Sequence, residues 1–91
     1  MVTAIILFDI KRGCVDRVGE WLAGLPGITE VYSVGGRIDL VAIARLKDNE
    51  ALSELVNQTL AKNDEIERTE SLIAFKLFSQ HDLEAMFSIG F

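Results

Sequence analysis

The sequence predicts one α+β domain with the order strand, helix, strand, strand, helix, strand. Three observations support this fold class. The chain has 91 residues, the size of a single domain. Its apolar residues pass from strand-like runs to helical spacing and back, twice. A paired glycine, Gly35–Gly36, separates two short apolar runs in the middle, as in a β-hairpin.

The first two elements are a strand over residues 2–10 and a helix over residues 14–25. The strand is apolar on both faces and therefore needs cover on both. In the helix, an apolar stripe recurs at helical spacing: Cys14, Val18, Trp21, Leu22 and Leu25. Gly24, Pro26 and Gly27 then end the helix.

The hairpin follows, with strands expected over residues 28–35 and 38–46. Gly35 and Gly36 supply the positive φ of a tight turn. Asp39 lies just past this turn. A carboxylate in that position fits either turn chemistry or contact with a small polar ligand, and the residues leave both open.

The second half predicts a helix, a long strand and a tail. Asp48 or Asn49 caps a helix whose apolar stripe is Leu52, Leu55, Val56 and Leu60. The last strand is expected over residues 66–78. Residues 79–91 begin with a capping-box pattern and continue as an apolar helical tail, expected to pack on the domain or on a neighbouring subunit. The domain is therefore assigned to residues 1–78.

This order is the ferredoxin-like βαββαβ arrangement: a four-stranded antiparallel sheet with two helices on one face. The other face is left open although its strands are apolar. Since 49% of the residues are hydrophobic, we expect a second copy to cover this face in a dimeric α+β barrel.

Composition argues against several functions. The net charge is −5 and the basic residues are scattered, which disfavours direct nucleic-acid binding. No phosphate-binding loop, metal-ligand spacing or membrane-length apolar run occurs, so we expect no metal, cofactor or membrane association. The single cysteine fits a cytoplasmic protein. We interpret Cys14 and Trp21 as core and His81 as solvated, while Tyr32 fits packing, a dimer contact or a ligand wall.

Three stretches taken together resemble the effector-binding domain of the Lrp/AsnC (feast/famine) transcription regulators, often called RAM. They are residues 25–34, the hairpin segment 36–41, and the entry into the last strand, 66–75. The resemblance covers residues 2–78. Because residue 1 leads directly into the first strand, the chain resembles the stand-alone members, which have no helix-turn-helix domain.

The resemblance implies a non-enzymatic module that binds an amino acid or related metabolite and modulates transcription without binding DNA. It also implies homodimers that join into a ring, up to an octamer, and co-assembly with a full-length regulator. Effectors in this family lie between dimers, near the hairpin turn and the last strand. Carried over by position, the ligand-binding residues are Gly35, Gly36, Arg37, Asp39, Thr69, Glu70 and Ser71.

These residues suit a zwitterion. Turn N–H groups accept an α-carboxylate, and Asp39 or Glu70 holds an α-ammonium. The alternatives are turn capping by Asp39 and strand pairing by Thr69 and Ser71. For the whole chain, the alternatives are a small α+β-barrel enzyme of monooxygenase or isomerase type and a purely structural oligomer. An ACT-type amino-acid sensor shares the strand order.

Overall fold

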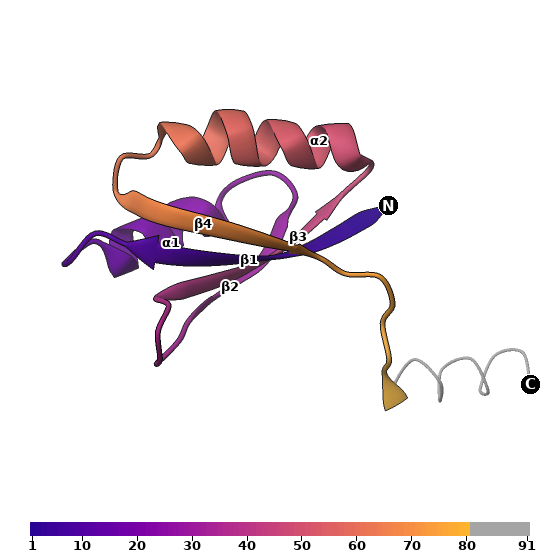
Figure 1. Ribbon diagram of the computed structural model, residues 1–91, viewed down its shortest axis with the longest axis horizontal. Helices are drawn as coiled ribbons and strands as arrows, with labels where there is room; N and C mark the ends of the chain where they lie inside the picture. The colour runs from indigo at the N-terminus through magenta and orange to yellow at the C-terminus, as the bar shows by residue number, and fades with distance from the viewer. Residues whose placement is uncertain (81–91) are drawn as a thin grey trace, which may run out of the picture.

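The computed structural model describes residues 1–80 and has the predicted element order (Figure 1). The elements are β1 (Val2–Ile10), α1 (Val15–Ala23), β2 (Ile28–Ser33), β3 (Leu40–Leu46), α2 (Asn49–Glu54) and β4 (Ile66–Ile73). The four strands form one antiparallel sheet in the order β2-β3-β1-β4. Most of the predicted tail, including His81, lies outside the described residues.

The core lies between one face of this sheet and the two helical segments. Alternate residues of the central strand β1, from Ala4 to Ile10, are buried on this face. Val18 and Leu22 of α1 pack there without exposed surface. The stripe predicted for the second helix also reaches the core: Leu52, Leu55 and Leu60 are buried, and Val56 is packed against them. Both predicted stripes are therefore confirmed.

The second helical segment changes its winding along its length. Asp48 caps its start, with Oδ1 accepting a hydrogen bond of 2.8 Å from the backbone N–H of Ala51. After Glu54 the segment continues as a π-helix, Leu55–Thr59, and ends in a 3₁₀ turn, Leu60–Lys62. The π-helical turn changes the angular spacing of the side chains, and Leu55 and Leu60 at its two ends are both buried.

The opposite face of the sheet carries apolar side chains that no described helix covers. In β1 and β3 these are Ile5, Leu7, Val41 and Ile43, all half-buried. At the edges, Tyr32 of β2 is 49% exposed and Leu72 of β4 is 44% exposed. We call this surface the open face. The prediction of a sheet with one apolar face lacking helical cover is confirmed for the described part of the chain.

The hairpin is wider than predicted. Its strands end at Ser33 and begin again at Leu40, so residues 34–39 form a six-residue loop instead of a tight Gly-Gly turn. Gly36 has φ +140°, whereas Gly35 has no positive φ. A two-residue turn of type I′ needs positive φ at both central residues, and within this loop only Gly36 has it.

The last strand is shorter than predicted and ends at Ile73 instead of residue 78. Ile73 pairs with Ala4, and the N–H of Ala74 donates to the Thr3 carbonyl at 2.9 Å. Beyond that point β1 offers almost no further backbone to pair with. The chain then leaves the sheet (Figure 1), and Phe75 is 99% exposed.

Candidate functional site

The loop of residues 34–39 projects from the end of the sheet but is fixed at its base. Val34 N–H donates to the Asp39 carbonyl at 3.1 Å. The Asp39 carboxylate accepts a hydrogen bond of 2.8 Å at Oδ2 from the N–H of Ile10. Gly35, Gly36 and Arg37 form the exposed tip. The structure thus gives Asp39 the turn-fixing role that the sequence left open, and its other oxygen, Oδ1, has no hydrogen-bond partner among residues 1–80.

The three predicted residues of β4 lie on two faces of the sheet. Thr69 pairs with Phe8 and Ser71 with Ile6, so both are on the helix-covered face. Glu70 pairs with Leu7 and lies on the open face, where its Oε1 is 3.8 Å from Arg68 Nη2. The Thr69 and Ser71 hydroxyls therefore point away from the Glu70 carboxylate.

One subunit does not bring the two groups of predicted residues together. Leu40 and Thr69 pair with Phe8 from opposite sides, so the whole width of β1 separates the base of the loop from β4. Two inter-strand spacings amount to about 10 Å. Both groups lie at the same end of the sheet. A ligand can touch both only if it spans β1 or if a second subunit supplies one of the two groups.

A pocket of about 550 Å³ on the open face was not predicted. Ile5 and Ile43 contribute apolar surface to it, and Glu30, Tyr32 and Arg45 contribute polar groups. The Tyr32 hydroxyl donates to the Glu30 carboxylate, which raises the pKa of Tyr32 above its ordinary value. Alternation along residues 28–33 places Glu30 and Tyr32 on one face, and this signal was available in the sequence. No local pattern indicated that residues 74–77 lie close enough to complete the pocket.

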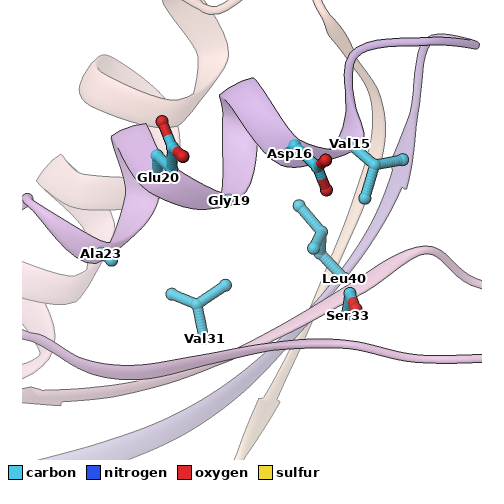
Figure 2. Close-up of a pocket in the computed structure, with 8 residues that line it drawn as sticks. All are labelled: Val15, Asp16, Gly19, Glu20, Ala23, Val31, Ser33 and Leu40. Carbon is cyan, nitrogen blue, oxygen red and sulfur yellow. The ribbon is translucent and has the colours of Figure 1, made fainter.

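A second hollow, of about 290 Å³, lies on the other side of the sheet between α1 and the edge strand β2 (Figure 2). We call it the α1–β2 groove. Its apolar lining consists of Val15, Gly19, Ala23, Val31 and Leu40, and its polar lining of Asp16, Glu20 and Ser33. The spacing of Asp16 and Glu20, four residues apart on one helix, is the sequence signal that could have indicated its acidic wall.

Cys14 belongs to a small polar cluster at the start of α1. It is 7% exposed, with Sγ 3.4 Å from Glu65 Oε2 and 3.3 Å from Arg17 Nη2. Arg17 Nε donates to Glu65 Oε1 at 2.9 Å, which holds the pKa of the Glu65 carboxyl below its usual range. The cluster joins α1 to the segment before β4, which agrees with a structural role for Cys14.

Two kinds of site have no candidate within residues 1–80. No group of three His, Cys, Asp or Glu side chains in this range is arranged to hold a metal ion. None of its helices is long and apolar enough to cross a membrane.

The family described as "Lrp/AsnC ligand binding domain" matches residues 3–83. The HTH-type transcriptional regulator FL11 of Pyrococcus horikoshii is 33% identical over 73 residues, which are 80% of this chain and 48% of that regulator. The chain therefore spans about half the length of the curated relative it matches.

Solved structures share the fold. The Thermus thermophilus protein TTHA0845 is 44% identical, with a TM-score of 0.81 over 88% of this chain and 100% of that one. The transcriptional regulator NMB0573 of Neisseria meningitidis, solved with L-Met, is 20% identical and agrees in fold alone. Its TM-score is 0.76 over 87% of this chain and 53% of that one.

Proposed function

Because the chain belongs to the Lrp/AsnC ligand-binding domain family, we propose that it is a cytoplasmic effector-binding module of transcription regulation. It binds an amino acid or a related small metabolite at the loop of residues 34–39, where subunits meet. Two relatives support this proposal: FL11 is named as a transcriptional regulator, and NMB0573 was solved with L-Met.

The state of Asp39 is the observation that carries the proposal. Its carboxylate is held in place through Oδ2 by the backbone of Ile10. Oδ1 keeps free hydrogen-bonding capacity within the described chain, so a positioned acceptor stands ready for an ammonium group. The exposed backbone of Gly35 and Gly36, a few residues away, offers N–H groups to a carboxylate. Together these groups match the two charged ends of an amino acid.

We propose that neighbouring subunits complete this site. One subunit leaves the loop and the β4 residues about 10 Å apart, so we expect Thr69, Glu70 and Ser71 to reach the effector from an adjoining subunit. Pairing of the open faces gives the dimer, because Ile5, Leu7, Val41 and Ile43 would otherwise keep apolar surface in water. Dimers then associate further into a ring.

We propose that the chain affects transcription by assembling with a regulator and not by contacting DNA itself. A net charge of −5 with scattered basic residues gives little attraction to phosphates. Co-assembly with a full-length Lrp/AsnC regulator would carry the effector signal to DNA. FL11 and NMB0573 are named as transcriptional regulators, and we propose no catalytic step for this chain.

Calorimetric titration with each of the twenty amino acids tests the proposal. We expect at least one to bind, and Asp39→Asn to weaken that binding about tenfold or more, because a charge-assisted bond contributes roughly 1.5–3 kcal/mol. The asparagine can still accept from Ile10, so the loop keeps its anchor. Glu67→Gln is the matched control, because it also replaces a carboxylate by an amide, at an exposed position in β4. Absence of any binding, or equal binding by Asp39→Asn, contradicts the proposal.

A further inference from the structure

The pocket of about 550 Å³ on the open face lies at the end of the sheet away from the loop of residues 34–39. Its strand residues surround the Thr3–Arg45 pair, whereas the loop begins beyond the Phe8–Leu40 pair at the other end of β1. Along a strand this separation is roughly 17 Å. Figure 1 shows the loop and the chain after β4 at opposite ends of the molecule. A molecule in the pocket is therefore separate from the amino-acid site of the proposed function.

One subunit supplies both a floor and a wall for this pocket. Ile5 and Ile43, which pair across β1 and β3, form the floor. Residues 74–77, which we call the arm, form the wall, and their large apolar side chains, Phe75 and Leu77, are exposed. Small-molecule sites have volumes of about 300–1,000 Å³ and are lined mostly by apolar side chains. The pocket therefore has the size and the surface for a small molecule with an apolar body.

Two cationic side chains of the lining keep free donors. Arg45 of β3 and Lys76 of the arm make no ion pair within residues 1–80. Arg45 Nη1 donates to Thr29 Oγ1 at 3.0 Å, which uses one of the five N–H groups of a guanidinium. Lys76 Nζ lies 5.0 Å from the centre of the Phe78 ring, a contact that leaves its N–H groups available. Both cations can therefore bind an anion.

The one acidic residue that lines the pocket, Glu30, already has a donor within the chain. The Tyr32 hydroxyl donates to its Oε2, and the raised pKa of Tyr32 keeps this hydroxyl protonated at neutral pH. The lining thus has two unpaired cations against one carboxylate that accepts a hydrogen bond. The excess of one positive charge complements a ligand with a single negative charge and disfavours a ligand that also carries an ammonium group.

From these observations we propose that the pocket binds a small organic acid, a monocarboxylate with an apolar body and no ammonium group. Its carboxylate lies over Thr3, between Arg45 and Lys76. Thr3 pairs with Arg45 on one side, and its carbonyl accepts from the N–H of Ala74 on the other, so each cation is about one strand spacing away. The apolar body lies between the floor and the arm. In a dimer paired through the open faces, the second sheet would lie over the bound acid.

The test uses two monocarboxylates of different shape, hexanoate and phenylpropanoate. Norleucine and phenylalanine are the same two molecules with an α-ammonium group added, so they are the matched controls for ligand charge. Amide NMR spectra of the labelled chain locate each ligand. We expect at least one of the acids, at millimolar concentration, to shift the signals of Thr3, Ile43 and Arg45 and not those of Gly35 and Gly36. Its amino-acid counterpart should bind the pocket about tenfold more weakly or not at all.

Charge variants identify the groups that bind the acid. Arg45→Gln and Lys76→Gln should each weaken its binding about tenfold, because each removes a charge-assisted hydrogen bond. Glu30→Gln should strengthen it about twofold or more, because a repulsive charge is removed while the amide oxygen still accepts from Tyr32. Lys62→Gln, which removes an exposed cation on the 3₁₀ turn, should bind the acid as wild type does. Thermal unfolding checks that each variant is folded.

The inference is overturned if neither acid binds, if the shifted signals are those of Gly35 and Gly36, or if folded Arg45→Gln and Lys76→Gln both bind as wild type does. Weaker binding by Glu30→Gln would also overturn it, because the carboxylate would then be part of the site. Asp39→Asn, the variant that tests the amino-acid site, should leave binding of the acid unchanged. A chain that binds the acid but no amino acid contradicts the proposed function alone, and the reverse contradicts this inference alone.

Discussion

Removal of the Asp39 side chain should destabilise the fold even without any ligand. The N–H of Ile10 lies where the β1–β4 register shifts between Asp9 and Ile10, and Asp39 Oδ2 accepts its hydrogen bond at 2.8 Å. Ile10 is 5% exposed, so water cannot readily replace this acceptor. Asp39→Ala thus leaves a buried donor unpaired, at a cost of about 2 kcal/mol.

Asp39→Asn should cost less, about 1 kcal/mol or below, because an amide oxygen can still accept from Ile10 while the charge is lost. For a domain of this size, 1 kcal/mol corresponds to roughly 4–8 °C in Tm, so Asp39→Ala should melt about 10 °C below wild type. Far-UV circular dichroism at fixed protein concentration measures both variants, since association makes Tm concentration-dependent.

The relative destabilisation of Asp39→Ala and Asp39→Asn shows whether the fold needs the acceptor oxygen or the charge. If Asp39→Ala unfolds within about 0.5 kcal/mol of wild type, as ordinary surface substitutions do, the hydrogen bond to Ile10 is not what fixes the loop. If Asp39→Asn is destabilised as much as Asp39→Ala, the charge and not the acceptor is what the fold needs. Either result would refute the role of Asp39 Oδ2 as the acceptor that holds the Ile10 N–H.

Three further predictions concern backbone strain, pH and the open face. Gly27 has φ +88° and an added Cβ would lie 2.3 Å from Leu46 Cδ2; Gly27→Ala should therefore lower the free energy of unfolding in urea by about 2 kcal/mol. Arg17 holds the pKa of Glu65 below its ordinary 4.5, so the stability that this pair adds is present above pH 4.5 and is lost as pH falls through the lower folded-state pKa. Glu65→Gln should accordingly show a shallower loss of stability on acidification than wild type. Ile43→Asp should lower the mass measured by light scattering below that of wild type, because it places a charge in the proposed open-face contact.

Each of these has a matched control. Gly13 has φ +83° with open space around its Cβ position, so Gly13→Ala isolates the backbone share, about 1 kcal/mol. Equal effects at Gly13 and Gly27 would remove the role of Leu46. Glu67→Gln should keep the wild-type acid slope, and Glu65→Gln doing the same would contradict the ion-pair argument. Ser53→Asp, exposed on α2, should keep the wild-type mass.

Local patterns were sufficient for much of the fold. Helical spacing from Cys14 to Leu25 and from Leu52 to Leu60 identified the stripes that the structure buries, because amphipathic periodicity directly reflects which side meets the core. The Asp48 cap followed from side-chain chemistry within one turn.

The two errors of the fold prediction have a common physical origin in pairing across the sheet. Ile73 ends β4 because β1 starts at Val2, and apolar alternation up to residue 78 contains no information on that limit. Similarly, Asp39 bonds to the backbone of Phe8 and Ile10, about thirty residues earlier in the chain, and these bonds fix the base of the loop. Glycine pairs indicate that the chain turns, but distant partners decide how wide the turn is.

For the candidate site, the sequence predicted the segments but not their arrangement in space. The sequence indicated the loop and β4 as separate stretches, but their separation by β1 is a property of the strand order β2-β3-β1-β4. The α1–β2 groove depends on how α1 packs over Val31 and Leu40. Such hollows arise from tertiary packing. The sequence alone indicates only that two acidic residues lie on one face of the helix.

The central place of β1 also has a consequence for synthesis of the chain. Within this domain, β1 is synthesised first, and its two partners are residues 40–46 and 66–73. One edge of β1 can pair once residues 40–46 have been made, but the other must wait for residues 66–73, a delay of several seconds at about 5–20 residues per second. During that interval β1 keeps an unpaired edge, and the sheet can be completed only when Ile73 has cleared the exit tunnel.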